Sequence, residues 1–296
     1  MSLPADASGT GGFRLDRPAV AAAFDRAAGR YDAAAQLQEE VRRELLGRLQ
    51  YFRLAPQAVL DLGAGTASAS VALRRRFRRA RVIALDIAPG MLRVARKRRW
   101  PWRRFECLCA DAHALPLREA SVDLIFSNLM LQWSDRPERV FQECARVLRP
   151  GGLLLFSSFG PDTLGELRAA WAAVDAAPRV SVFPDLPELA AALQYARFSE
   201  PVLDADRLVR HYRDVRALME ELRAIGARNA AAERARGLTG PRTLERMIGA
   251  YERQRQAQGI PATWEVFYGA AFAGGAPAAA AGEHVVPLAR LRRRGS

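Results

Sequence analysis

The chain has 296 residues and a formal net charge of +13, and half of its residues are hydrophobic. This length favours a single large domain with a full core, and the absence of an 18-residue apolar run excludes a membrane-spanning helix. The N-terminus lacks the basic and apolar segments of a secretory signal, so we expect a cytoplasmic protein that does not enter a membrane.

Cysteine and histidine usage argues against a metal site. The three cysteines are odd in number and do not suit a disulfide framework. Cys107, Cys109 and His113 lie close together in the sequence, but a structural zinc site needs four ligands and no fourth candidate is nearby. We therefore expect no metal.

The N-terminal segment divides into two parts. Residues 1–18 are rich in Gly, Ser, Thr and Asp without hydrophobic periodicity, which predicts disorder. Helical patterning begins near residue 19, and Phe24, Tyr31 and Gln38 follow at intervals that place them on roughly one helical face. Such an aromatic stripe is typical of core packing, and it also suits a lid over a bound ligand.

Residues 58–68 combine a short strand, a glycine turn and the start of a helix. The strand is an apolar run over 59–62 that is too short for a helix. Gly63 and Gly65 then allow a tight turn and a close approach of the backbone to a ligand. The helix that follows would present its free N–H groups to that ligand. This arrangement predicts the nucleotide-binding corner of an α/β sheet.

Two residues indicate which nucleotide this corner fits. The dinucleotide fingerprint has a third glycine where this chain has Ser68. Asp61, within the strand end, would repel a pyrophosphate, whereas its carboxylate suits the cationic amino group and sulfonium of S-adenosylmethionine. The corner therefore favours the methyl donor.

Acidic or amide residues end the strands that follow. Asp86 ends the second strand about 20 residues beyond the glycine turn, the spacing at which an acid holds ribose hydroxyls. Asp111 ends the third strand, where its side chain could hold an adenine amino group, and Asn128 ends the fourth. Open α/β sheets bind ligands at the carboxyl ends of their strands, so these residues predict one site. The five strands are expected at residues 58–62, 81–86, 105–111, 122–128 and 151–158.

This strand-end pattern, together with Leu-Arg-Pro-Gly-Gly at 148–152, resembles the class I S-adenosylmethionine-dependent methyltransferases over about residues 20–160. The resemblance implies a Rossmann-like α/β fold: a mostly parallel seven-stranded sheet with helices on both faces. It also implies that Arg-Ala-Ala-Gly-Arg-Tyr-Asp at 26–32 folds over the donor, with Tyr31 in the lid and Phe24 behind it. The donor-binding residues implied are Phe24, Tyr31, Gln38, Asp61, Gly63, Ala64, Gly65, Asp86, Ile87, Met91, Asp111, Ala112, Asn128 and Leu129.

The segment 127–133 lies where the reacting methyl group should be presented. Methyltransferases that act on exocyclic amines of nucleic acids resemble this fold but carry Pro-Pro-aromatic after the Asn or Asp at this point. Here Leu129 and Met130 follow Asn128, and the segment contains no cysteine nucleophile for pyrimidine chemistry. We therefore expect no nucleic-acid substrate. No catalytic residue is evident, and Tyr31, Gln132 and Trp133 are candidates for the catalytic site.

The segment beyond the fifth strand is expected to choose the acceptor, because acceptors are selected by elements outside the sheet. Thr163 and Glu166 have the spacing of a capping box and predict a helix start. Further helices are expected at 187–196, 215–225 and 242–258, an extended stretch at 201–212 and a final strand at 262–268. The predicted organisation has three segments: a disordered N-terminus 1–18, one domain 19–273 and a disordered basic tail 274–296. Within the domain we expect a helical lid 19–54, a donor-binding core 55–160, an acceptor cap 161–260 and a final strand 261–273.

A narrower resemblance appears in these acceptor-choosing parts. The stretches at 128–133, 159–168, 222–229, 237–240 and 259–266 look like the malonyl-acyl-carrier-protein O-methyltransferases of biotin synthesis. One departure is visible: the family often ends in Gly-His-Ala-Trp, whereas this chain has Gly-Ala-Ala-Phe at 269–272. The resemblance implies methyl transfer to the malonyl carboxylate on acyl carrier protein or CoA. Since a carboxylate is ionised at neutral pH, no general base is needed.

The arginine excess is open to two interpretations. Such charge is either a solvated face or a surface for an acidic partner, which the resemblance would make an acyl carrier protein. Arg213 and Arg216 are candidates for holding the malonyl carboxylate. Three other functions stay open: methylation of a small molecule such as a quinone precursor, methylation of RNA, and a donor-binding scaffold without turnover.

Overall fold

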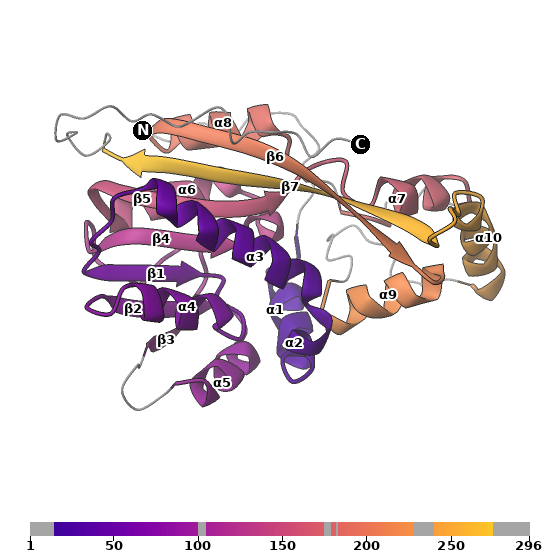
Figure 1. The fold of residues 1–296 in the computed structure, drawn as a ribbon, viewed down its shortest axis with the longest axis horizontal. Helices are drawn as coiled ribbons and strands as arrows, with labels where there is room; N and C mark the ends of the chain where they lie inside the picture. Colours follow the sequence, from indigo (N-terminus) through magenta and orange to yellow (C-terminus); the bar gives the residue numbers. More distant parts are fainter. Residues whose placement is uncertain (1–14, 100–104, 175–178, 182, 228–239, 275–296) are drawn as a thin grey trace, which may run out of the picture.

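The computed structural model describes residues 15–99, 105–174, 179–181, 183–227 and 240–274. Their centre is a seven-stranded sheet in the order β3-β2-β1-β4-β5-β7-β6, in which β7 runs antiparallel between β5 and β6 (Figure 1). This confirms the predicted mostly parallel class I sheet. The strands are β1 (Ala58–Leu62), β2 (Arg81–Asp86), β3 (Glu106–Cys109), β4 (Val122–Asn128), β5 (Leu148–Phe159), β6 (Phe198–Tyr212) and β7 (Ile260–Ala273).

Alternating apolar side chains give the sheet two buried faces, each covered by helices. One hydrophobic cluster joins alternate strand residues to α3 (Gln36–Arg48) and α4 (Ser68–Arg76). The other cluster packs the opposite face against α6 (Pro137–Val147) and α8 (Leu186–Tyr195). Figure 1 shows α3 and α4 in front of the sheet and α6 and α8 behind it. The near-continuous apolar strands follow from this double coverage.

The strand order reverses direction between β1 and β4, because the chain moves outward through β2 and β3 and then returns to the other side of β1. Ligands of open α/β sheets bind in the crevice outside the strand ends at such a point. Helix α5 (Pro89–Lys97) follows β2, and the short η2 (Leu131–Trp133) follows β4. The helices α1 (Arg17–Ala27) and α2 (Tyr31–Ala34) lie at this same end of the sheet (Figure 1).

Strands β6 and β7 extend beyond the rest of the sheet and carry the expected cap. At their far end lie α7 (Gly165–Ala172), α9 (Val215–Ala224) and α10 (Pro241–Glu252), as Figure 1 shows. Helix α10 packs on α7 and α9. The fully buried Tyr251 fixes α10 to β7 by donating its hydroxyl hydrogen to the carbonyl of Pro261 at 2.8 Å.

Several boundaries differ from the sequence-based prediction. Disorder was expected through residue 18, but α1 begins at Arg17 because Asp16 caps it by accepting a hydrogen bond from Ala19 N at 3.0 Å. The fourth predicted cap helix ends at Glu252 rather than at residue 258, because the chain then turns and Gln256 pairs with Gly259. Residues 1–14 and 275–296, where disorder was also expected, lie outside the described residues.

The capping box predicted from Thr163 and Glu166 is wrong. The Thr163 hydroxyl instead donates to the carbonyl of Glu265 at 3.0 Å, and the Glu166 carboxylate accepts from Thr263 N at 3.1 Å. Both side chains therefore tie α7 to β7, while Leu164 in a left-handed conformation precedes the helix. Local spacing could not reveal a partner about 100 residues away in the sequence.

Candidate active site

The glycine turn after β1 has the backbone that only glycine adopts readily. Gly63 has φ +74° and Gly65 has φ +54°. A Cβ atom on Gly63 would lie 2.3 Å from Cγ of Met130. Met130 therefore packs against the turn so closely that no residue with a side chain fits at position 63 without a shift. The N–H of Gly63 is fixed by the carbonyl of Leu85 at 2.9 Å. The turn thus stays open towards the ligand side.

Asp86 at the end of β2 is held in a fixed orientation by main-chain donors. Its carboxylate accepts hydrogen bonds from Gly65 N and Ala88 N, both at 2.8 Å. Burial raises the pKa of Asp86, and these backbone hydrogen bonds only partly oppose the rise. The result is an oriented carboxylate beside the glycine turn, suited to the two hydroxyls of a ribose.

Asp111 after β3 belongs to a polar network that also holds the start of α1. His113 Nδ1 lies 2.6 Å from the Asp111 carboxylate, and His113 Nε2 lies 2.8 Å from Oγ of Ser134. The guanidinium of Arg17 donates to Asp111 at 3.3 Å and to Asp135 at 3.1 Å. Burial raises the pKa of Asp111, but the hydrogen bonds from His113 and the charge of Arg17 outweigh it and keep the pKa low.

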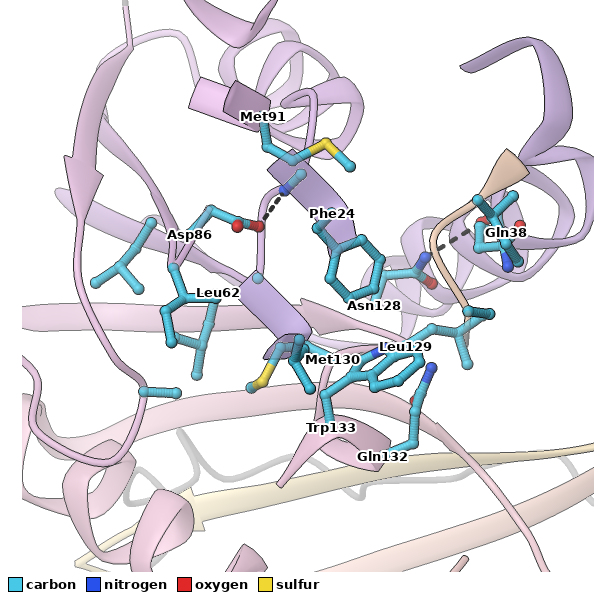
Figure 2. Close-up of a pocket in the computed structure, with 18 of the residues that line it drawn as sticks. Phe24, Gln38, Leu62, Asp86, Met91, Asn128, Leu129, Met130, Gln132 and Trp133 are labelled. Carbon is cyan, nitrogen blue, oxygen red and sulfur yellow. Dashed lines mark hydrogen bonds between the residues drawn. The ribbon is translucent and has the colours of Figure 1, made fainter. Parts of the chain in front are cut away.

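The aromatic stripe of the N-terminal segment covers the pocket. The ring of Phe24 meets Trp133 edge-on with centroids 5.1 Å apart, and it lies 6.4 Å from the ring of Tyr31 (Figure 2). Burial raises the pKa of Tyr31, and the charges of Asp86 and Asp32 raise it further, so the phenol keeps its proton. The stripe both packs and lines the pocket, which reconciles the two interpretations left open by the sequence.

Asn128 at the end of β4 uses both ends of its amide within the protein. Its Nδ2 donates to the carbonyl of Gln38 at 3.1 Å, and its Oδ1 accepts from the hydroxyl of Ser157 at 3.1 Å. Asn128 thereby joins α3 to β4 and β5. The side chain of Gln38 lines the pocket, and its Oε1 is buried without a hydrogen-bond partner among the described residues.

These elements enclose a pocket of about 1010 Å³, a volume that includes its open mouth. Fourteen predicted residues line it: Phe24, Tyr31, Gln38, Gly63, Gly65, Asp86, Ile87, Met91, Asp111, Ala112, Asn128, Leu129, Gln132 and Trp133. Figure 2 shows Asp86 and Met91 on one side and Gln132 on the other, with Phe24 and Trp133 between. Its lining combines apolar side chains with a few convergent polar groups, as is typical of small-molecule sites.

Asp61 and Ala64 do not line the pocket. Asp61 is buried behind the glycine turn, where its carboxylate accepts a hydrogen bond from Ser70 Oγ at 2.5 Å. Burial raises its pKa to about 7, although the bond from Ser70 lowers it. Ala64 packs against the hydrophobic cluster of the α3 face. Asp61 therefore does not line the pocket, and this placement does not support the predicted contact of its carboxylate with the donor's cationic groups.

Arg213 and Arg216 also lie outside the pocket lining. Arg213 is exposed and pairs with Asp214 at 2.8 Å, and Arg216 is exposed on α9. Arg213 follows β6 just before α9, and Arg216 is an exposed residue of α9, whose Val215 and Leu218 are buried. Their proposed role at the malonyl carboxylate is not supported by this placement.

Eleven residues that line the pocket are absent from the predicted set, and six of them show where the sequence falls short. Arg17 lies within the segment 1–18 that the sequence predicts to be disordered, and Val20 lies just after it. From the sequence, His113 is interpreted only as a candidate metal ligand. The signal that could have placed it in the pocket is its position two residues after Asp111. Phe159, Ile225 and Trp264 come from β5, the end of α9 and β7, and nothing local indicates that such distant segments meet.

The described residues contain neither a metal-binding cluster nor a membrane-spanning helix. Among the described residues, no group of three His, Cys, Asp or Glu side chains is placed to hold a metal ion. In the same part of the chain, every helix is too short or too polar to cross a bilayer.

Known proteins resemble this chain in fold and in sequence. Its fold matches a Haloferax volcanii methyltransferase solved with the Trm112 methyltransferase activator, at 20% identity and TM-score 0.55, over 87% of this chain and 99% of that one. A methyltransferase from Thermotoga maritima matches with TM-score 0.51 at 19% identity, over 84% and 98% of the two chains. The family model "Methyltransferase domain" matches residues 60–156.

Other proteins are much more similar to this chain in sequence than these solved structures are. A malonyl-[acyl-carrier protein] O-methyltransferase of Laribacter hongkongensis is 46% identical over 271 residues, covering 89% of this chain and 91% of that protein. Its counterpart in Xylella fastidiosa is 49% identical over 253 residues, covering 85% and 86%. With these similarities and the sheet of a class I enzyme, the chain belongs to the family of S-adenosylmethionine-dependent malonyl-[acyl-carrier protein] O-methyltransferases.

Proposed function

We propose that this enzyme transfers the methyl group of S-adenosylmethionine to the free carboxylate of a malonyl group on acyl carrier protein, giving the methyl ester that primes pimeloyl synthesis for biotin. The observation that carries this proposal is the identity of 40–49% to proteins of that name over most of the chain. A pocket at the carboxyl ends of the strands of a class I sheet supports it. The acceptor is the carboxylate of a malonyl group. The finer part of the proposal is that this group is carried by acyl carrier protein and not by CoA.

The donor would lie across the carboxyl ends of β1 to β4. Asp86 would hold the ribose hydroxyls, because its carboxylate is fixed by two main-chain donors. Asp111 and Ala112 would face the adenine, with Ile87 and Met91 as its apolar contacts. The glycine turn, Tyr31 and Gln38 would surround the methionine end, where the methyl group leaves.

Transfer requires an in-line attack by a malonyl carboxylate oxygen on the methyl carbon. The carboxylate is ionised at neutral pH, so the protein supplies no base. The rate would come from holding the two reactants in line and from a pocket that excludes water. Phe24 and Trp133 close over the pocket edge-on and would shield the reacting atoms.

The carrier is proposed from charge. Acyl carrier proteins are acidic, and a chain of net charge +13 would attract one electrostatically and orient it. CoA would present the same malonyl group without this attraction. We expect no nucleic-acid substrate, and the expected cytoplasmic location stays a prediction.

The test is methyl transfer from labelled S-adenosylmethionine to malonyl-acyl carrier protein, with malonyl-CoA, acetyl-acyl carrier protein and total RNA as parallel acceptors. The proposal predicts label on the malonyl thioesters, with the carrier protein preferred at low salt, and none on the acetyl form because it lacks the carboxylate. Label on RNA, or only on an added small molecule such as a quinone precursor, would overturn it.

A further inference from the structure

The part of the lid formed by α1 and α2 repeats one pair of residues. Phe24 and Tyr31 line the pocket, and an aspartate follows each of them, Asp25 in α1 and Asp32 in α2. Neither aspartate lines the pocket, so neither is placed to touch a bound donor. Their carboxylates bind instead to the segments that follow β1 and β2.

Asp25 caps a helix that is not its own. Helix α5 has Ala88 at its N-cap position, which offers no side-chain acceptor for the free N–H groups of the first turn. The Asp25 carboxylate supplies one, because it accepts a hydrogen bond from Gly90 N and lies 3.4 Å from the guanidinium of Arg93. A Cβ atom on Gly90 would lie 2.8 Å from the carbonyl oxygen of Asp25. Helix α1 therefore rests directly on the first turn of α5.

Asp32 binds the segment between the glycine turn and α4. Its carboxylate accepts a hydrogen bond from the hydroxyl of Thr66 at 2.6 Å. Thr66 is buried and follows Gly65, which lines the pocket. The other carboxylate oxygen of Asp32 pairs with Arg98, whose guanidinium also donates to Oγ of Ser68 at 2.5 Å. Asp32 thus joins the lid to the turn whose glycines line the pocket.

We propose that Asp25 and Asp32 are positioning residues that latch the lid over the bound methyl donor. They act through Phe24 and Tyr31, the residues that precede them, and hold the two rings against the pocket from two separate attachment points. A donor beneath these rings leaves only after the lid has moved, which breaks the bonds of both carboxylates. The inference rests on the donor-binding part of the proposed function and is independent of the acceptor.

The hydrogen bonds of the two carboxylates are strong enough to govern how long the donor stays. A hydrogen bond to a charged group contributes more than one between neutral groups. The side chains of Asp25 and Asp32 are 37% and 43% exposed, so solvent screens their ion pairs with arginine. The bonds to Gly90 N and to the Thr66 hydroxyl should therefore carry most of the effect. Losing either should speed donor release about 3- to 20-fold.

The test measures the rate at which bound S-adenosylhomocysteine leaves the enzyme. Enzyme loaded with the labelled compound is chased with an excess of the unlabelled one. Asp25→Ala and Asp32→Ala should each release the label about 3- to 20-fold faster than the wild type. Because the rate is measured on the bound complex alone, a variant that only folds less completely leaves it unchanged. A wild-type release rate in either variant would overturn the latch.

Asp123→Asn is the matched control. The Asp123 carboxylate also binds two main-chain N–H groups, both at 2.8 Å, and the guanidinium of Arg149, at 2.6 Å. These bonds lie at the start of β1, whereas the lid lies at the carboxyl ends of the strands. The control should unfold more easily yet release the label at the wild-type rate. If it releases the label as fast as the lid variants, the effect follows from lost stability and the proposal fails.

Thr66 tests the bond to Asp32 from its other side. Thr66→Val removes the hydroxyl and should speed release as Asp32→Ala does, whereas Thr66→Ser keeps the hydroxyl and should not. Combining Thr66→Val with Asp32→Ala should add nothing further, because both changes break the same bond. Effects that multiply in the double variant would show that the two residues act separately and would overturn the role of this bond. Wild-type enzyme that binds no S-adenosylhomocysteine would instead refute the donor placement on which the latch rests.

Discussion

Asp61 should make this protein less stable as the pH rises towards neutrality. The ordinary pKa of an aspartate is 3.8, and burial raises that of Asp61 to about 7. Between these values the unfolded chain has released the proton that the folded protein still holds. Folding therefore loses about 1.4 kcal/mol per pH unit across this window and nothing further above pH 7. The full penalty has an upper bound of about 4 kcal/mol.

Asp61→Asn is expected to remove this penalty, because an amide oxygen can still accept the hydrogen bond from Ser70. The variant should be more stable than the wild type by about 2–4 kcal/mol at pH 8, with the difference shrinking towards zero at pH 4. Urea unfolding at fixed pH values measures it. Comparing the two proteins at each pH cancels the contributions of other titrating groups.

Asp123→Asn provides a control of opposite sign. Burial raises the pKa of Asp123, but hydrogen bonds from Arg149, Ala58 and Gln57 outweigh this and lower it, so its stabilisation is present at neutral pH and lost in acid. That variant should be less stable than wild type at pH 7 and match it at low pH. The reasoning on Asp61 is refuted if Asp61→Asn shows a pH-independent difference or is the less stable protein at pH 8.

Three further substitutions test the pocket. Gly63→Ala should destabilise by about 2–5 kcal/mol, from its positive φ and the contact with Met130, and weaken donor binding. Gly65→Ala, with open space around its Cβ, should cost only about 1–2 kcal/mol in urea unfolding, and equal losses would contradict the packing argument. Arg17→Ala should weaken S-adenosylhomocysteine binding several-fold by calorimetry, because α1 loses its ties to Asp111 and Asp135, and less so at high salt. A salt-independent effect would assign Arg17 a packing role.

Local sequence patterns were sufficient to bring most of the predicted donor-binding residues to one pocket. The glycine turn, Asp86, Asp111 and Asn128 each end or follow a strand, and parallel strands bring their carboxyl ends to one edge. Phe24 and Tyr31, predicted by helical spacing and by resemblance, line the same pocket. For each of these residues, the position along its own strand or helix determines which way the side chain points.

The pocket residues contributed by β5, β7 and α9 depend on long-range contacts that no local pattern contains. Trp264 and Phe159 meet at 5.3 Å only because β7 lies antiparallel beside β5. Thr163 and Glu166 have capping-box spacing but bond to β7, since tertiary partners outcompeted the local ones. Arg213 was suggested by its charge and place in the chain, and its direction towards solvent follows from the packing of α9.

The central claim is that the malonyl carboxylate itself receives the methyl group. Malonyl-acyl carrier protein and acetyl-acyl carrier protein should each be incubated with S-adenosylmethionine and the enzyme, and the intact carriers weighed. We expect the mass of one added CH₂ group on the malonyl carrier, none on the acetyl carrier, and no gain with the Asp86→Ala variant, which removes the proposed ribose contact. An unchanged mass of the malonyl carrier, or an equal gain on the acetyl carrier, would contradict carboxyl methylation.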